Sequence, residues 1–382
     1  MAGRRALVIG GGIGGLAAGI ALRRVGWEVR IHERAPRIEA RGSGLAIQPN
    51  AMLALRHLGL EAPVRAAGHE IRRTDFLDPE GRVLKRVPVG PLADAVGAPA
   101  LTIDRGTLQR ILLDAAGSAV RPGKELVDLD QIPGGVLALF ADGTEERGDL
   151  LVGADGLRSA VRTALYGPEA LRAAGYVAWR GLALAAPLWP AGASAEIWGR
   201  GLRFGIARVD ERTIYWFAVQ NLPPGGRDPE AGAKPGLLER FGEWCAPVPA
   251  LLAATPEEGI LRNDILDRPP RPAPWGRGRV TLLGDAAHPM TPNLGQGACQ
   301  ALEDAVVLAR RVEGAADPGE GLRAYEAQRA PRTSAFVTRS HRAGAVGGWA
   351  SPTACALRDC ALRAVPGPMV GVGIRNAWRF QP

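Results

Sequence analysis

Three glycines at fixed spacing near the N-terminus form the first pattern with chemical meaning. The pattern is Gly10-x-Gly12-x-x-Gly15, and Glu33 stands at the end of the next predicted strand. Glycines placed between a strand and a helix allow a tight turn, close approach of a pyrophosphate and close packing of the helix on the strand. Glu33 can accept a hydrogen bond from an adenosine ribose hydroxyl, and its charge repels a 2′-phosphate. The pattern therefore predicts NAD or FAD rather than NADP here, with a purely structural glycine turn as the alternative.

Two further motifs follow in order along the chain. The second, at the end of another predicted strand, is Gly153-Ala154-Asp155-Gly156-Leu157-Arg158-Ser159-Ala160-Val161-Arg162. The third is Gly284-Asp285-Ala286-Ala287-His288-Pro289, followed by Thr291-Pro292-Asn293-Leu294-Gly295-Gln296-Gly297 and a predicted helix. An NAD-dependent enzyme that uses only the glycine motif would leave both of these motifs unexplained.

With the three motifs in this order, the chain resembles the group A flavoprotein monooxygenases, the family of para-hydroxybenzoate hydroxylase, salicylate hydroxylase and kynurenine 3-monooxygenase. The resemblance extends to about Arg332 and is nearest the branch of urate hydroxylase and zeaxanthin epoxidase. It implies FAD as cofactor, with NADH or NADPH and O2 as co-substrates. The implied reaction hydroxylates or epoxidises a small aromatic or polyunsaturated substrate through a C4a-hydroperoxyflavin. No second dinucleotide fingerprint is needed, because this family binds the reductant transiently.

The same resemblance implies which residues contact FAD. Asp285 would bond a ribityl hydroxyl, and the turn before the last helix would stabilise the negative charge of reduced flavin. Arg105, Arg41 and Arg34 match or neighbour positions that contact FAD, although each could instead be a surface arginine. The full expected set is Gly10, Gly12, Ile13, Gly14, Gly15, Glu33, Arg34, Arg41, Arg105, Asp155, Gly284, Asp285, Pro292, Gly295, Gln296 and Gly297.

No protein side chain is assigned as catalytic, because the flavin carries the difficult chemistry. His288 could act as a base, but its place in the flavin-binding loop favours a structural role. No cluster with metal-ligand spacing is present in the sequence. Two rival interpretations keep FAD: a dehydrogenase, reductase or isomerase that inserts no oxygen, and a redox-inactive FAD-binding protein.

Three residues are expected to face the substrate. Arg203 and Tyr215 match positions that face the substrate in the urate hydroxylases, and Asn293 lies in the loop of the third motif. Alternatively, Arg203 and Tyr215 merely pair within a sheet. Urate hydroxylases carry an aspartate where this chain has Asn293. An amide cannot accept a proton as a carboxylate does, which argues against urate as the substrate.

The elements that must position these motifs have their own signals. Apolar runs at Ala6–Ile9 and Leu150–Gly153 end in glycine turns as buried parallel strands do, and Leu16–Val25 has helical spacing. The fold class is therefore α/β: a Rossmann-like FAD-binding domain of the para-hydroxybenzoate hydroxylase type, interleaved with a sheet-rich substrate domain, and a C-terminal helical segment. The expected divisions are 1–70, 99–175 and 271–345 for FAD, 71–98 and 176–270 for substrate, and 346–382 for the tail, with one helix over Ser351–Ala364.

Composition narrows the remaining possibilities. The net charge of +8 comes almost entirely from arginines spread along the chain, without the basic and aromatic cluster of a nucleic-acid site. The four cysteines lack the spacing of a disulfide framework, which favours a cytoplasmic enzyme. No stretch is apolar enough for stable membrane insertion. The oligomeric state stays open between monomer and homodimer.

Overall fold

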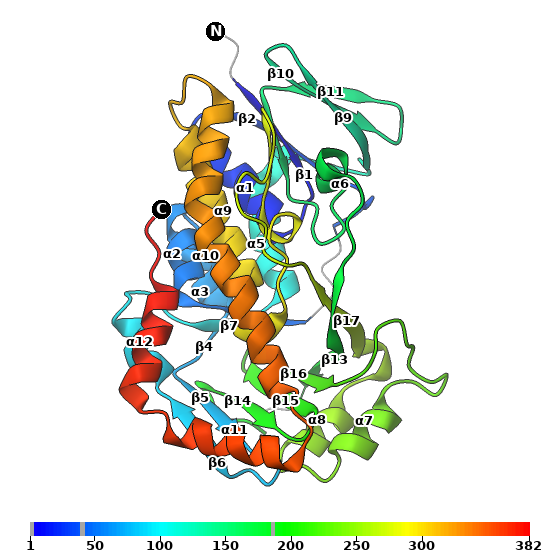
Figure 1. Cartoon of the computed structure of the whole chain (residues 1–382), viewed down its shortest axis with the longest axis vertical. Helices are drawn as coiled ribbons and strands as arrows, with labels where there is room; N and C mark the ends of the chain where they lie inside the picture. The colour runs from blue at the N-terminus through cyan, green and yellow to red at the C-terminus, as the bar shows by residue number, and fades with distance from the viewer. Residues whose placement is uncertain (1–3, 39–42, 185–187) are drawn as a thin grey trace.

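The computed structural model describes residues 4–38, 43–184 and 188–382. Arg41 lies outside the described residues. The chain forms a layered α/β body at one end and a broad sheet at the other, joined by long helices (Figure 1). Among the described residues, no helix combines the length and apolar character needed to cross a membrane.

A five-stranded parallel sheet organises the first end, with strand order β18-β12-β1-β2-β8. Its strands are β1 (Arg5–Ile9), β2 (Glu28–Glu33), β8 (Val120–Pro122), β12 (Leu150–Gly153) and β18 (Val280–Leu282). The central strands are short apolar runs that are buried on both faces, as expected of parallel strands covered by other layers. Strands from distant parts of the chain thus complete one sheet, as the sequence predicts.

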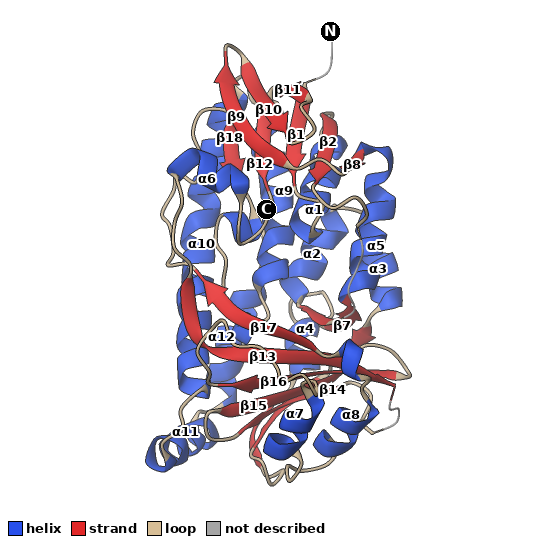
Figure 2. Cartoon of the chain, turned by 90° about the vertical axis from the view of Figure 1, so that its right-hand side faces the viewer, coloured by secondary structure: helices blue, strands red, loops and turns tan. Residues whose placement is uncertain are grey.

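Helices cover one side of this sheet, and an antiparallel meander covers the other (Figure 2). The helices α1 (Ile13–Arg24), α5 (Arg105–Ala116) and α9 (Gly297–Val312) pack together, with α2 (Pro49–His57) against α9 and α3 (Glu61–Ala67) beside α2. The meander consists of β9 (Leu126–Ile132), β10 (Gly135–Phe140) and β11 (Glu145–Gly148). All these elements share one hydrophobic core.

A seven-stranded sheet forms the second end, in the order β17-β13-β16-β15-β14-β5-β6. Its strands are β5 (Arg73–Leu77), β6 (Val83–Val87), β13 (Arg172–Leu184), β14 (Ala193–Trp198), β15 (Leu202–Arg208), β16 (Thr213–Gln220) and β17 (Leu261–Asp267). One face packs against α7 (Lys234–Phe241) and α8 (Val248–Ala254) around Phe204 and Trp216. Because side chains alternate along a strand, Arg203 and Tyr215 point to the opposite face. The segment is sheet-rich as expected, and the two helices cover one face of its sheet.

Smaller elements connect the two ends. A three-stranded sheet of β3 (Gly44–Ile47), β4 (His69–Glu70) and β7 (Leu101–Asp104) lies between them, and α4 (Val89–Asp94) and α6 (Ala160–Tyr166) follow β6 and β12. Short 3-10 turns occur at Gly117–Ala119, Glu257–Gly259, Gly284–Ala286 and Pro292–Leu294. We retain the division into FAD, substrate and tail segments as a proposal.

Three helices end the chain. The helix α10 (Pro318–Gly347) spans both ends of the molecule (Figure 1), and α11 (Pro352–Ala364) agrees closely with the predicted helix. A further helix, α12 (Gly367–Trp378), was not expected. Pro366 is the N-cap of α12 and Pro368 lies in its first turn, where proline lacks only an N–H that has no partner, so these prolines are compatible with the start of a helix.

Candidate active site

The glycines of the turn after β1 fall into two kinds: some are required by close packing, and one faces open space. A Cβ on Gly10 would lie 2.4 Å from the Ala154 carbonyl oxygen, and a Cβ on Gly15 would lie 1.9 Å from the Gly10 carbonyl oxygen. Gly10 also has a φ of +111°, which favours glycine. In contrast, a Cβ on Gly12 would meet no described atom within 4 Å. The fold itself requires two of the glycines, whereas Gly12 faces open space at the N-terminus of α1, where a pyrophosphate fits.

Glu33 holds this turn. Its carboxylate accepts hydrogen bonds from the backbone N–H of Gly11 at 2.8 Å and of Ala35 at 2.9 Å. The side chain is half-buried, so it keeps lone pairs that can accept from a ribose hydroxyl. Arg34 is exposed beside it. Glu33 thus has the place that the dinucleotide interpretation needs.

Asp285 is accessible to solvent although its neighbours Gly284 and Ala286 are buried. Surrounding protein nevertheless removes water from the carboxylate and raises its pKa, an effect that the charges of His288 and Arg105 oppose. An accessible but partly desolvated carboxylate lines a recess rather than a convex surface. Arg105, exposed at the start of α5, makes no side-chain hydrogen bond or ion pair within the described part of the chain.

The loop of the third motif turns back at Gly295, whose φ is +60°. Gln48 donates to the Leu294 carbonyl oxygen at 2.7 Å and accepts from the Gln296 side chain at 2.5 Å. The helix α9 begins at Gly297, where a Cβ would lie 3.9 Å from Asp285 Oδ1. Both halves of the third motif therefore meet at one recess, and the positive end of α9 lies beside it.

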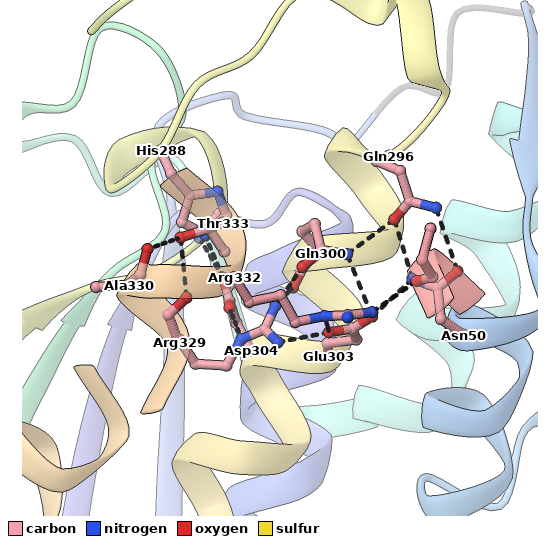
Figure 3. Close-up of polar contacts among 12 residues, drawn as sticks. Asn50, His288, Gln296, Gln300, Glu303, Asp304, Arg329, Ala330, Arg332 and Thr333 are labelled. Atoms are coloured by element: carbon pink, nitrogen blue, oxygen red, sulfur yellow. Dashed lines mark hydrogen bonds and ion pairs between the residues drawn. The ribbon is translucent and has the colours of Figure 1, made fainter. Parts of the chain in front are cut away.

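A buried ionic network lies beneath this loop (Figure 3). Arg329 of α10 is buried between Glu303 and Asp304 of α9, and its Nε donates to Asp304 Oδ1 at 2.6 Å. Burial alone would raise the pKa of Asp304, but the charges of His288 and Arg329 outweigh it and lower that pKa to about 2. Asp304 also accepts from the Gly284 backbone N–H at 3.0 Å, so the network fixes the flavin-binding motif.

His288 belongs to this network. Its Nε2 lies 2.6 Å from Asp304 Oδ2, and the ring is buried. This geometry supports the structural interpretation of His288. Sequence reasoning missed Glu303, Asp304 and Arg329, although two adjacent acids in an otherwise apolar helix were a signal that could have identified them.

The second motif is joined to the third by Arg162. Its Nη1 donates to the carbonyl oxygens of Ala286 at 3.0 Å and Ala287 at 3.1 Å. Asp155 accepts from Ser159 Oγ at 2.5 Å and from the Val161 backbone N–H at 3.1 Å, and burial raises its pKa. The Asp155 carboxylate therefore holds the start of α6.

On the substrate side, Arg203 and Asn293 meet directly. Arg203 Nη2 donates to Asn293 Oδ1 at 2.9 Å, and its Nη1 lies 3.2 Å from Glu196 Oε1. The guanidinium carbon lies 5.3 Å from the Tyr176 ring centroid, a cation–π distance. Asn293 Nδ2 lies 2.7 Å from the Tyr176 hydroxyl. We call Arg203, Asn293, Tyr176 and Glu196 the substrate-side cluster.

Tyr215 lies elsewhere on the same sheet. Its ring packs on β3, where a Cβ on Gly44 would lie 2.1 Å from Tyr215 Cγ. In the sheet register Tyr215 is opposite Ala207, whereas Arg203 is opposite Val219. Arg203 and Tyr215 are therefore not direct cross-strand partners.

One short loop carries both functions. Asn293 belongs to the substrate-side cluster and pairs with Arg203, while Gln48 holds Leu294 and Gln296 on the side of Asp285. A glycine turn open to phosphate, an accessible carboxylate and this loop together define an FAD-binding oxidoreductase in which the loop also joins a polar and aromatic cluster.

Comparison with known proteins gives the family. The family described as "FAD binding domain" matches residues 4–191 and 266–340, and the chain belongs to it. The aurachin C monooxygenase/isomerase of Stigmatella aurantiaca is 44% identical over 377 residues, covering 98% of each chain. The FAD-dependent urate hydroxylase of Klebsiella pneumoniae is 35% identical over 343 residues, covering 88% of this chain and 89% of that protein.

The fold has solved counterparts of the same kind. Klebsiella pneumoniae HpxO complexed with FAD and uric acid superimposes with a TM-score of 0.93 at 32% identity, covering 98% of this chain and 96% of the other. The expected fold class and recognition of the family are thereby confirmed. The protein is a flavin-dependent monooxygenase.

Proposed function

We propose that the protein uses NADH or NADPH and O2 to hydroxylate or epoxidise a small aromatic or polyunsaturated molecule held beside the loop Thr291–Gly297. The observation that carries this proposal is that one short loop joins the two regions: Asn293 pairs with Arg203 in the substrate-side cluster, while Gly297, four residues on, lies beside Asp285. FAD, when bound, supplies the oxygen-transfer chemistry. The protein binds and orients both partners and excludes water between them.

Several residues would hold FAD. The open space at Gly12 takes the pyrophosphate, Glu33 the adenosine ribose and Asp285 a ribityl hydroxyl. Arg105 supplies a positive charge without a protein partner among the described side chains. The N–H groups at the start of α9 would stabilise negative charge on the reduced flavin.

FAD binding is tested with Gly12→Val. Its added side chain enters open space at an extended φ of −76°, so the apoprotein keeps its stability while FAD affinity falls about a hundredfold or more. Gly15→Val is the matched control, because it clashes with the Gly10 carbonyl and destabilises the apoprotein itself. Tight FAD binding by Gly12→Val would contradict the assignment.

The substrate-side cluster suits a ligand with a ring that carries a polar atom. Arg203 can donate toward a ring oxygen, Tyr176 supplies an aromatic wall, and Glu196 balances the charge. Asn293 cannot accept a proton as an aspartate does, which disfavours urate. The aurachin C monooxygenase/isomerase aligns with this chain over 98% of the length of each protein. We therefore favour an aurachin-type substrate over urate.

An arginine-lined hollow of about 550 Å³ supports the choice of a nicotinamide nucleotide as reductant. It is lined by Arg162, Arg268, Arg271 and Arg277, with Glu169 as the one carboxylate in the lining. Four guanidinium groups against one carboxylate suit the phosphates of a dinucleotide. Arg162 also links this hollow to the flavin-binding motif.

The hollow is tested with Arg277→Gln, which changes an exposed side chain. The KM for the reductant should rise at least about fivefold with kcat unchanged, because ground-state binding alone is lost. Arg212→Gln, exposed on the far sheet, is the control. Equal KM values in the two variants would remove this support for the reductant.

The reaction itself is tested with 18O2. The FAD-loaded protein is supplied with NADH or NADPH and a panel of unsaturated ring compounds, including aurachin C and urate, and products are analysed by mass spectrometry. Incorporation of one oxygen atom from O2 is expected. A rearranged or dehydrogenated product without the label would instead favour an isomerase, dehydrogenase or reductase on the same scaffold. The name monooxygenase/isomerase of one relative makes the isomerase the leading alternative.

A further inference from the structure

The last two helices leave an apolar surface without a partner. Leu357 of α11 and Met369 of α12 are 66% and 67% exposed, and Val365 and Val372 are 38% and 48% exposed. We call these four residues the C-terminal apolar face. Isolated exposed apolar side chains are common, but these four follow one another along α11, the short connection at Val365 and α12, two adjoining helices at the edge of the molecule (Figure 1).

Helical periodicity explains why Leu357 and Met369 are exposed on their own helices. The buried residues of α11 are Cys355 and Arg358, and those of α12 are Gly371 and Trp378. Leu357 and Met369 therefore lie on the sides of their helices turned away from the body of the protein. The outward positions near Leu357 are also apolar and small: Ala356, Cys360, Ala361 and Ala364.

Charge distinguishes this face from an ordinary surface. Asp359 is the only acidic residue from Ser351 to Pro382, and Arg358 pairs with it at 2.9 Å. Arg363, Arg375 and Arg379 are exposed, and within the described residues their nearest carboxylate contact is the 3.9 Å approach of Arg363 to Asp78. The face is thus apolar and nearly free of negative charge, and three exposed arginines belong to the same C-terminal segment.

The face is also held firmly from inside. Trp378 Nε1 donates to Gln48 Oε1 at 2.7 Å, and Arg332 donates to the Ala377 carbonyl oxygen at 2.8 Å. The helix α12 therefore presents its outer side from a fixed position, rather than as a loose tail.

We propose that the C-terminal apolar face docks the enzyme on the surface of a bilayer containing anionic lipids. Aliphatic side chains enter the boundary between headgroups and acyl chains, while the exposed arginines of the same segment meet negative headgroups. A symmetric contact between two copies would bring these arginines together without nearby acids to neutralise them. The helices lie on the membrane and do not cross it.

Vesicle sedimentation tests the proposal with the FAD-loaded protein. Vesicles of phosphatidylcholine are compared with vesicles in which about a third of the lipid is phosphatidylglycerol. Binding to the anionic vesicles should be at least about tenfold tighter and should weaken as salt is raised. The triple variant Leu357→Ser, Met369→Ser, Val372→Ser should bind at least about tenfold more weakly.

Two further variants keep the test decisive. Val127→Ser changes a valine that is 60% exposed on β9, at the other end of the molecule, and should bind as the unchanged protein does. Arg375→Gln, Arg379→Gln removes charge without touching the apolar contacts and should abolish the preference for anionic vesicles, even if the serine variant folds poorly. Equal binding to both vesicle types, or none, would overturn the proposal. Concentration-dependent dimerisation that the serine variant abolishes would also overturn it, and would show that a second copy covers the face.

Discussion

Two buried arginines flank the loop Thr291–Gly297, and they differ in how completely they are paired. All three nitrogens of Arg329 are engaged, by Asp304, Glu303 and Gln300. Arg203 faces one carboxylate, Glu196, and its Nε has no partner among the described residues. The flavin side thus has a closed ionic scaffold, while the substrate side keeps an incompletely satisfied cation. The fully paired Arg329 suits a scaffold that holds the cofactor in place. The partly paired Arg203 leaves a hydrogen-bond donor that a bound ligand can use.

The largest effect that tests this comparison is expected from Asp304→Asn. The change removes the negative charge that faces Arg329 and His288, and unfolding free energy should fall by about 3–5 kcal/mol, with loss of FAD. Urea unfolding and flavin absorbance measure both effects. Asp94→Asn is the control, since it breaks only an exposed pair with Arg72 and should leave the unfolding free energy nearly unchanged. Similar losses in the two variants would show that the network is not a scaffold.

Acid pH should weaken the same network. The pKa of Asp304 is about 2 in the folded protein against an ordinary 3.8, so its stabilisation is present above pH 3.8 and is lost as pH falls toward 2. The loss should amount to about 2 kcal/mol. Unfolding free energies measured between pH 5 and pH 2 should fall more steeply in the unchanged protein than in Asp304→Asn. Parallel curves would mean that folding does not lower the pKa of Asp304.

A smaller effect is expected on the substrate side from Asn293→Asp. The new carboxylate can pair with Arg203, but it loses the donor that faces the Tyr176 hydroxyl and the Ser340 carbonyl oxygen. Stability should fall by about 1–2 kcal/mol with FAD still bound. Flavin content and urea unfolding are the measurements.

Asn221→Asp is the matched control for that variant, because Asn221 donates to the Gly348 carbonyl oxygen from an exposed position. If Asn293→Asp lost FAD and Asn221→Asp did not, Asn293 would belong to the scaffold that holds the flavin. The proposed difference between the two sides of the loop would then be wrong.

The smallest effect is expected from Trp378→Phe, which keeps the buried ring but removes the N–H that donates to Gln48. Stability should fall by about 1 kcal/mol, and FAD dissociation should quicken a few-fold because Gln48 also holds the loop at Leu294. Trp189→Phe, which loses a hydrogen bond to Ala193 in the other sheet, should leave FAD dissociation unchanged. Equal rates of FAD dissociation in the two variants would show that α12 does not help to hold the flavin-binding loop.

Local patterns were sufficient for the elements around the motifs. The apolar runs at Ala6–Ile9 and Leu150–Gly153 and the helical spacing of Leu16–Val25 each act through neighbours in sequence, and the structure places two strands and a helix there. The helix α12 was missed because proline can either end a helix or begin one, and its packing on α2 and α4 decides the outcome.

The sequence by itself determined that this protein binds FAD in an α/β fold, because glycine spacing and short motifs act through local backbone geometry. Only the tertiary structure decided which buried polar side chains pair with one another. Asp304 and Arg329 are 25 residues apart, and Arg203 and Asn293 are 90 residues apart, yet each pair is in direct contact. Ionic and amide pairings of this range depend on how α9, α10 and β15 pack, which no local spacing encodes. The same packing leaves Gly12 open to a ligand and closes the space around Gly10 and Gly15.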